Sequence, residues 1–410
     1  WLKHFHCSPH QARQARQAMA FRLLIPLLLG RSAAELQAHF VGPDAGYPLA
    51  RCLDGTPALY YLSSGYDSGK DKYLIFHQGG GFCDSDADCL ERADTYLGST
   101  SSDDPANNAY AQYAHENGLW RDAAQNPLMH NWNHVFVRYC DGAYYSGDRL
   151  EPRMIDGKEV FFRGKYITEA IFKDLAPKLA SATDVVLSGC SAGAIRIYAH
   201  LDSLRAMVPS AAKVVGLADS GFFMDVELFT PKKKFVATGH NGTALLSPKC
   251  LRDYPAEPHK CYVGSVVSAY LDTPLFAFQS RFDTDQREGE MDEACRNSEA
   301  CVSNYAASLT NKTEEHLAGK HGYFLDSCER HCFFSNERPV GDASGLTPLQ
   351  AFASWCDGGA AVYGQAAVPS CKQCCHGTST SNPLLSADAL VLCQRHLGMS
   401  WADSSCSSQF

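Results

Sequence analysis

The sequence has no long apolar run, no excess of positive charge and no internal repeat of a useful period. No hydrophobic stretch approaches the roughly eighteen residues that a membrane-spanning helix needs, which argues against an integral membrane protein. The net charge is −9, and a field of that sign repels nucleic acids at long range. With 45% hydrophobic and 20% charged residues, the composition is that of a soluble globular protein, and the length of 410 residues leaves the domain count open.

The first 34 residues differ from the rest. Residues 1–18 contain the polar near-repeat Gln11-Ala-Arg-Gln-Ala-Arg-Gln17 and precede an internal methionine, Met19, so we expect that they are not part of the native protein. From Met19 the pattern is typical of a secretory signal peptide. Its basic start, apolar stretch and cleavage site are, in order, Arg22, Leu23–Leu29 and Ser32-Ala33-Ala34. A buried N-terminal helix is the alternative, and Pro26 disfavours it. We predict a leader and signal peptide over 1–34 and one domain over 35–410.

Cysteine content supports export. The chain has 18 cysteines, more than a cytosolic enzyme of this size usually keeps reduced, so disulfides are expected. Removal of residues 1–34 also removes Cys7 and leaves one thiol over in a fully paired chain. Asn241-Gly-Thr243 and Asn311-Lys-Thr313 are glycosylation acceptors in a secreted protein. The sequence therefore predicts a secreted, extracellular, disulfide-bonded glycoprotein.

Short β-rich apolar segments alternate with helical patterns along the chain. The expected strands contain Tyr73–Phe76, Val135–Arg138, Asp184–Leu187, Lys213–Gly216 and Leu275–Phe278. The expected helices cover Tyr166–Leu179, Ala192–Met207 and Tyr262–Tyr270. Such alternation is typical of a mostly parallel sheet with helices on both faces. The predicted class is α/β.

A pentapeptide between the third strand and the second helix fits the nucleophile-elbow motif G-x-S-x-G. In Gly189-Cys-Ser-Ala-Gly193 the serine lies on a sharp strand-to-helix turn, which exposes its hydroxyl at the carboxyl edge of a sheet. The flanking glycines are needed because side chains at these positions would meet the adjoining strand and helix. An ordinary glycine-rich turn is the alternative. We expect Ser191 to be a nucleophile in an α/β-hydrolase-like fold.

A glycine run after the first of these strands can supply backbone donors for an oxyanion. His77-Gln-Gly-Gly-Gly-Phe82 is similar to the H-G-G-G type of oxyanion loop, which predicts donors near Gly81 and Phe82, completed by the N–H of Ala192. A flexible loop is the alternative. Cys83 and Cys89 follow, and we expect them to close a small disulfide loop rather than to bind a cation.

These motifs resemble, in order, those of the pectin acetylesterases and of the related Notum carboxylesterases. The resemblance rests on Gly79–Cys83, Asn131–Asn133, Arg138–Ala143, Ser146–Asp148, Phe162–Gly164, Gly189–Gly193, Leu217–Asp225, Phe282–Gln286 and Ser327–Cys332. Two departures stand beside the oxyanion loop. Gln78 replaces a glutamate that is usual in the family, and Phe82 replaces a tryptophan. Both bear on the choice of substrate.

The resemblance implies a catalytic triad of Ser191, Asp283 and His331. The chain order Ser…Asp…His is that of the α/β-hydrolases. Three other assignments are open from the residues alone: Asp285 in place of Asp283, His321 in place of His331, and Asp219 as the acid. In the implied cycle, the histidine removes the proton of the serine, the serine attacks an ester, and water releases the acyl-enzyme.

No cofactor or metal is expected. The segment Cys371-Lys-Gln-Cys-Cys-His376 lacks the haem-attachment order, and zinc binding would need a second cysteine pair in a reducing compartment. Disulfides are favoured there. Cys328 and Cys332 are expected to pin the histidine loop by disulfides, and Cys190 is expected to pack or to pair, with Cys140 as its candidate partner.

The resemblance implies a carboxylic ester hydrolase that removes acetyl groups from a polysaccharide such as pectin. A Notum-like removal of a fatty acyl group from a secreted signalling protein is the alternative, and an inactive carbohydrate-binding member of the family is a third hypothesis. Without residues 1–34 the net charge is about −14, which disfavours a strongly anionic polymer unless the groove is locally basic. The resemblance also implies an esterified or acylated substrate as the partner and a location outside the cell or in a cell wall. The expected state is a monomer.

Overall fold

The computed structural model of the chain describes residues 36–102, 121, 123, 126–210, 212–333 and 346–364. The predicted signal peptide and the segment 371–376 lie outside these residues. The described strands are β1 Gln37–Val41, β2 Ala58–Ser63, β3 Lys72–His77, β4 Asn133–Val137, β5 Arg153–Ile155, β6 Lys158–Val160, β7 Asp184–Cys190, β8 Lys213–Asp219, β9 Leu275–Ser280, β10 Gly322–Asp326 and β11 Val362–Gly364.

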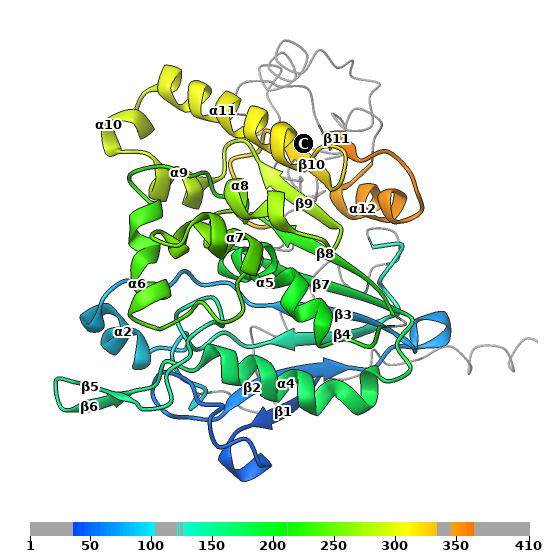
Figure 1. Cartoon of the computed structure of the whole chain (residues 1–410). Coiled ribbons are helices and arrows are strands. Elements are labelled where there is room, and N and C mark those ends of the chain that lie inside the picture. The colour runs from blue at the N-terminus through cyan, green and yellow to red at the C-terminus, as the bar shows by residue number, and fades with distance from the viewer. Residues whose placement is uncertain are drawn as a thin grey trace, which may run out of the picture. The chain divides into compact units, whose positions relative to one another are not determined.

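Ten α-helices and five 3₁₀ helices connect these strands in the described residues (Figure 1). The α-helices are α2 Asp86–Ala93, α4 Gly164–Leu179, α5 Ala192–Ala206, α6 Lys234–Thr238, α7 Pro248–Asp253, α8 Gly264–Val267, α9 Thr284–Glu290, α10 Glu293–Arg296, α11 Glu299–Leu317 and α12 Pro348–Cys356. The 3₁₀ helices are η1 Pro43–Ala45, η2 Asp67–Gly69, η3 Thr230–Lys233, η4 Pro258–Tyr262 and η5 Ser268–Tyr270. None of the helices in the described residues is both long and apolar enough to cross a membrane.

One sheet organises the described part of the chain. Its strand order is β1-β2-β4-β3-β7-β8-β9-β10-β11, and β5 and β6 form a separate antiparallel pair. β1–β2 and β2–β4 are antiparallel, whereas every pairing from β4 to β11 is parallel. The carboxyl ends of the parallel strands therefore lie along one edge of the sheet, where ligands of open α/β sheets bind.

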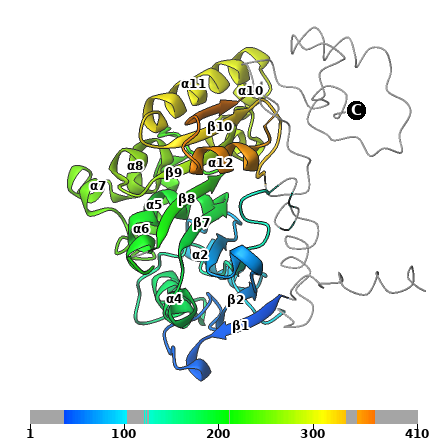
Figure 2. The ribbon, with the colours of Figure 1, turned by 90° about the vertical axis from the view of Figure 1, so that its right-hand side faces the viewer.

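Both faces of the sheet are buried. In β7, Val185 and Leu187 belong to the apolar cluster that includes α4, α5 and α11, whereas Val186 belongs to a second cluster that includes Leu349 and Phe352 of α12. α12 thus lies across the sheet from α5 (Figure 2). Strands that are covered on both sides are apolar at every position, which is why the central strands could be recognised as continuous apolar runs.

The predicted α/β class and its mostly parallel sheet are confirmed, and the five predicted strand segments correspond to β3, β4, β7, β8 and β9, although β4 ends at Val137, one residue before Arg138. The first two predicted helices correspond to α4 and α5. The third, over Tyr262–Tyr270, is only partly helical. The extended residue Val263 (φ −94°, ψ 119°) separates η4 from α8, and η5 follows, so the segment forms short turns rather than one helix.

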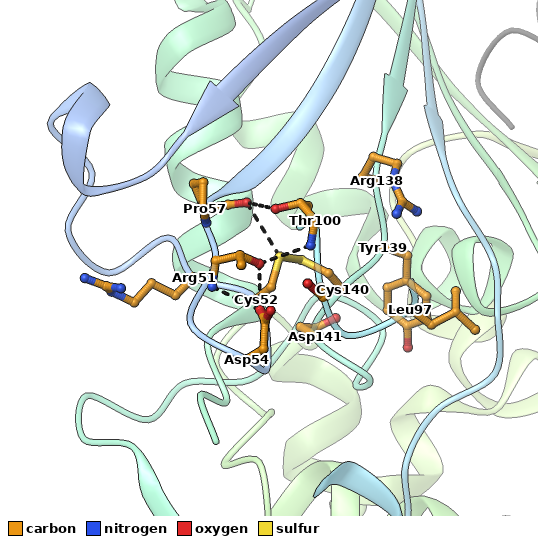
Figure 3. The surroundings of a disulfide bond; sticks show 12 residues. Arg51, Cys52, Asp54, Pro57, Leu97, Thr100, Arg138, Tyr139, Cys140 and Asp141 are labelled. Atoms are coloured by element: carbon orange, nitrogen blue, oxygen red, sulfur yellow. Dashed lines mark hydrogen bonds between the residues drawn. A yellow bond between two sulfur atoms is a disulfide. The ribbon is translucent and has the colours of Figure 1, made fainter. Parts of the chain in front are cut away.

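Five disulfides join described residues: Cys52–Cys140, Cys83–Cys89, Cys190–Cys332, Cys250–Cys261 and Cys295–Cys301. The predicted Cys83–Cys89 loop is confirmed. The predicted pairing of Cys190 with Cys140 is wrong, because Cys140 follows β4 and bonds to Cys52 ahead of the neighbouring strand β2 (Figure 3). β4 is separated from β7 by β3, and Cys190 instead bonds to Cys332.

Candidate active site

Ser191 lies on a strained turn between β7 and α5. Its backbone has φ 57° and ψ −122°, a left-handed φ that is uncommon for a residue with a side chain. Its N–H donates to the carbonyl of Asp219 at 2.9 Å, which fixes the turn to the end of β8. A strained serine directly after a parallel strand is the geometry of a nucleophile elbow, as the pentapeptide predicts.

The two glycines of the pentapeptide have the predicted steric role. A Cβ atom at Gly193 would lie 2.1 Å from the carbonyl oxygen of His77 in β3, and one at Gly189 would lie 2.6 Å from the carbonyl carbon of Gly193. Neither distance is possible between real atoms without movement of the backbone. Glycine at both positions is what lets α5 begin directly against the neighbouring strand.

The glycine run after β3 lies directly against Ser191. β3 and β7 pair in parallel with His77 opposite Gly189, so the two loops leave the sheet side by side. A Cβ atom at Gly79 would lie 2.5 Å from the carbonyl oxygen of Cys190 and 2.9 Å from Cβ of Ser191. Gly80 (φ 134°) and Gly81 (φ 67°) both have positive φ, and space is open where a Cβ of Gly81 would point. The start of the predicted oxyanion loop therefore lies against the serine.

Asp283 and His331 form a carboxylate–imidazole pair at the same edge. Nδ1 of His331 lies 2.8 Å from both carboxylate oxygens of Asp283, whose side chain is fully buried. Asp283 also caps α9, because its Oδ1 accepts from the N–H groups of Asp285 and Gln286 at 3.0 Å. The contact of Asp283 with Nδ1 leaves Nε2 as the nitrogen that can accept a proton.

Asp219 and Ser220 connect the nucleophile to the histidine loop. The carboxylate of Asp219 accepts from the N–H of Phe333 at 2.9 and 2.8 Å, and the hydroxyl of Ser220 accepts from the N–H of Cys332 at 2.9 Å. The Cys190–Cys332 disulfide makes a covalent link between the neighbours of Ser191 and His331. A nitrogen of the His331 ring lies within 4.8 Å of both sulfurs. Two hydrogen-bonded contacts and one disulfide thus hold the histidine loop against the end of β8 and the Ser191 turn.

The other assignments of acid and base fit this geometry less well. The carboxylate of Asp219 accepts from the backbone N–H of Phe333 instead of contacting an imidazole nitrogen by any described hydrogen bond. His321 precedes β10 at the opposite edge of the sheet, where its Nδ1 accepts from the N–H of Leu275. Asp285 is 61% exposed, and its Oδ2 lies 3.4 Å from Nε2 of His331 rather than from Nδ1. Asp283 with His331 is therefore the pair that the fold brings together.

The environment of His331 shifts its acidity. Burial opposes the charged imidazolium, but the carboxylates of Asp283, Asp285 and Asp219 outweigh burial and raise the pKa of His331 to about 9. Nε2 is buried and makes no hydrogen bond within the described part of the chain. An imidazole oriented by a carboxylate, with its second nitrogen unbonded, can accept a proton from a nucleophile.

Two groups of cysteine and histidine in the described residues are close enough together to hold a metal ion. These groups are Cys83, Cys89 and His240, and Cys190, His331 and Cys332. In each group the two cysteines are bonded to one another. A disulfide sulfur carries no thiolate charge, and thiolate is the form of cysteine that binds metal. Neither group offers a metal the ligands that it needs.

The two departures from the family motif lie on either side of the glycine loop. Gln78 is 1% exposed, and its Oε1 accepts from the guanidinium of Arg138 and from the N–H of Tyr139, so it anchors the loop to the residues after β4. Phe82 is half-buried against the rings of Tyr144 and Phe229, with centroids 5.3 and 6.0 Å away. Gln78 is therefore buried behind the loop, whereas Phe82 is partly exposed.

The connecting roles of Asp219 and Ser220 could not be seen in the motifs, whereas the expected disulfide at Cys332 is confirmed. Leu217–Asp225 and Ser327–Cys332 stand out as motifs, in which Asp219 is either a catalytic acid or a structural partner in its glycine turn. Ser220, at φ 56°, adopts the left-handed conformation directly after β8. A Ser-Gly pair after a strand could have indicated a tight turn at the sheet edge. What the turn holds could be seen only in the fold.

Comparison with known proteins agrees with the order of these motifs. The sequence model of the pectinacetylesterase family matches residues 33–355. Pectin acetylesterase 5 of Arabidopsis thaliana is 31% identical over 333 residues, which are 75% of this chain and 75% of that protein. The palmitoleoyl-protein carboxylesterase NOTUM of Drosophila melanogaster is 32% identical over 250 residues, which are 57% of this chain and 36% of that protein.

A solved structure shows the same fold. The crystal structure of the Wnt deacylase Notum from Drosophila superposes on this chain with a TM-score of 0.70 and 24% sequence identity. The superposition covers 84% of this chain and 99% of the Notum chain. The curated relatives are named as carboxylic ester hydrolases, in agreement with the expected reaction class. Since one family model spans most of its length, the chain belongs to the pectinacetylesterase family.

Proposed function

We propose that the chain is a secreted, monomeric serine carboxylesterase that hydrolyses acetyl esters on a polysaccharide such as pectin. Ser191 is the nucleophile, His331 the general base and acid, and Asp283 the carboxylate that orients His331. The observation that carries this proposal is the bonding of the His331 loop to the Ser191 turn, with Nδ1 of His331 bound by Asp283 and Nε2 left unbonded.

The reaction follows from these positions in two steps. In the first, Oγ of Ser191 forms a bond to the ester carbonyl carbon while Nε2 of His331 takes the serine proton, and the N–H groups of Gly81, Phe82 and Ala192 bind the oxyanion. Collapse breaks the bond to the sugar oxygen, which leaves as an alcohol with the proton from His331. In the second, water attacks the acetyl-enzyme with His331 again as base and releases acetate.

The packing around Phe82 supports a small acyl group. The ring of Phe229 packs edge-on against Phe82 and stacks on Phe223, with centroids 5.0 Å apart in the second pair. Phe223 and Phe229 are at most 8% exposed, so protein side chains fill the apolar space beside the oxyanion loop. A cavity for a long acyl chain would require these rings to be absent or displaced. The pectin acetylesterases among the relatives also match more of this chain than NOTUM does.

A Notum-like activity on a fatty acyl group is the second candidate. The identity of 32% to NOTUM of Drosophila melanogaster and the shared fold favour it. An inactive binding member of the family is the third hypothesis. It is disfavoured because the nucleophile, base and acid types are all present and the Asp283–His331 pair is formed.

Hydrolysis of p-nitrophenyl esters from acetyl to palmitoyl tests all three hypotheses. The parent is expected to prefer acetyl, and Ser191→Ala is expected to lower kcat by about 10⁵-fold or more. Release of acetate from acetylated pectin by the parent, and not by Ser191→Ala, would assign the carrier. A long-chain optimum would select the Notum-like activity. Equal rates for the parent and Ser191→Ala would remove the enzyme proposal.

A further inference from the structure

The two glycine carbonyls of the oxyanion loop are each held by a side chain from outside the loop. Nη2 of Arg92 donates to the carbonyl of Gly80 at 2.6 Å, and the hydroxyl of Tyr139 donates to the carbonyl of Gly81 at 2.8 Å. The peptide units that begin with these carbonyls end in the N–H groups of Gly81 and Phe82. These are two of the three donors that the proposed function assigns to the oxyanion.

Peptide geometry connects each carbonyl to one of these donors. A trans peptide unit is planar, so its C=O and N–H point in opposite directions. A hydrogen bond that fixes the carbonyl therefore fixes the direction of the N–H in the same unit. The loop itself does not impose this direction, because two consecutive glycines at φ 134° and 67° allow several orientations of their peptide units.

We propose that Arg92 and Tyr139 are positioning residues that aim the N–H groups of Gly81 and Phe82 at the oxyanion. This proposal rests on the proposed function and deepens it, since it assigns each donor its own side chain. Tyr139 sets the N–H of Phe82, and Arg92 sets the N–H of Gly81. Neither side chain touches the substrate.

Tyr139 is itself rigidly held. It is fully buried, its N–H donates to Oε1 of Gln78 at 3.0 Å, and its hydroxyl oxygen accepts from the N–H of Tyr144 at 3.0 Å. The next residue, Cys140, is bonded to Cys52 (Figure 3). A hydroxyl that accepts one bond has its proton directed to the remaining acceptor, the carbonyl of Gly81. Gln78 thereby acts on the loop through Tyr139.

Arg92 is held by α2 and by the ring of Tyr139. Its Nε donates to the carbonyl of Leu97 at 3.3 Å, and its guanidinium lies 5.1 Å from the centroid of the Tyr139 ring. The Cys83–Cys89 disulfide ties α2 to the residue that follows Phe82. The loop, α2 and the residues after β4 thus form one unit in which both carbonyl contacts are fixed before substrate arrives.

This role predicts a specific kinetic change. The oxyanion develops only as the transition state is reached. Misdirected N–H groups therefore lower kcat and leave KM nearly unchanged. In Tyr139→Phe the ring stays and one hydrogen bond is lost, and we expect kcat on p-nitrophenyl acetate to fall by about tenfold to a hundredfold. Arg92→Met should lower kcat in the same way, and it tests the hydrogen bond to Gly80 independently of Tyr139. A trifluoromethyl ketone, which forms a tetrahedral oxyanion adduct with Ser191, should bind more weakly by a similar factor.

Tyr73→Phe is the matched control, because the hydroxyl of Tyr73 also donates to a backbone carbonyl, that of Lys178 at 2.8 Å, at the other end of β3. Melting temperatures of all variants report on folding. An unchanged kcat in both Tyr139→Phe and Arg92→Met overturns the proposal. An equal fall of kcat in Tyr73→Phe, or a change in KM without a change in kcat, overturns it as well. Parental activity of Ser191→Ala would instead remove the proposed function, and the role in oxyanion binding with it.

Discussion

The two halves of the candidate site are built by different means. The nucleophile half, made of the glycine loop and the Ser191 turn, lies on adjacent parallel strands, and its geometry follows from close backbone contacts at Gly79, Gly189 and Gly193. The base half, Asp283 and His331, lies on loops after β9 and β10 and depends on a disulfide and on Asp219. Steric contacts close to the strands determine the geometry of the nucleophile half. A disulfide and hydrogen bonds across the sheet edge determine that of the base half.

This difference predicts different kinds of failure. A change in the nucleophile half should disturb folding and activity together, because the sheet and the site share the same contacts. A change in the base half should lower activity more than stability, because a disulfide and a few hydrogen bonds position this loop and are not packing contacts between strand and helix. Three variants, from the largest expected effect to the smallest, test this distinction.

Gly193→Ala is expected to have the largest effect. Its Cβ would lie 2.1 Å from the carbonyl oxygen of His77, so α5 must move away from β3. We expect a loss of about 3 kcal/mol in the free energy of unfolding, measured by urea denaturation, together with loss of esterase activity. A variant of parental stability that has also lost activity would show that the turn matters to the site alone.

Removal of the Cys190–Cys332 disulfide should have an intermediate effect. In the double variant Cys190→Ala/Cys332→Ala, the bonds from Asp219 and Ser220 remain but the covalent link is lost. We expect kcat to fall by about a hundredfold, since small displacements of a catalytic group carry losses of this size. Cys250→Ala/Cys261→Ala removes a disulfide elsewhere and is the control. Equal kcat values in the two double variants would contradict a positioning role.

Asp285→Asn should have the smallest effect, and it should appear in the pH profile. Burial lowers the pKa of His331 and the carboxylates around it, including Asp285, raise it, with a net value of about 9. A general base must be neutral, so kcat/KM should rise with pH and reach half of its maximum near pH 9. Asp285→Asn removes one cause of the raised pKa, and the acid limb should move to lower pH, with higher activity at pH 7. A shift to higher pH would show that Asp285 does not stabilise the imidazolium.

The same pKa links pH to stability. The folded-state pKa of His331 lies above the ordinary value of 6.5, so its ion pair with Asp283 stabilises the folded state fully below about pH 6.5. That contribution is lost as the pH rises through about 9. Catalysis and this part of the stability therefore change in opposite directions with pH.

The nucleophile half could be predicted from sequence because its information is local. The spacing of glycines around Ser191 and after Phe76 carries a steric requirement, and each requirement is met within a few residues or across one strand pairing. The base half could be named through the resemblance to a family, but its links could not be derived. The predicted pairing of Cys190 with Cys140 is wrong because the order of strands in the sheet, with β3 between β4 and β7, cannot be read from the sequence.

The positioning side chains could not be predicted for a related reason. Tyr139 lies in a recognised motif and Arg92 in none, and both meet the glycine loop only because α2 and the end of β4 fold against it. The chain between Gly81 and Tyr139 includes residues of β4 and α2 in very different environments, and no periodicity connects them. Every residue has a backbone carbonyl, so the sequence does not show which carbonyl accepts a hydrogen bond from a distant side chain.

The Cys190–Cys332 bond also determines what a protease can separate. It closes a ring of chain that contains α5, β8, β9 and β10 with their surface loops, including the exposed Lys232 in η3 and Lys234 at the start of α6. A single cut anywhere inside the ring would give two fragments, with Ser191 and His331 in different ones, that remain one covalent molecule. On a gel such a nicked protein would run as a single species until the disulfide is reduced.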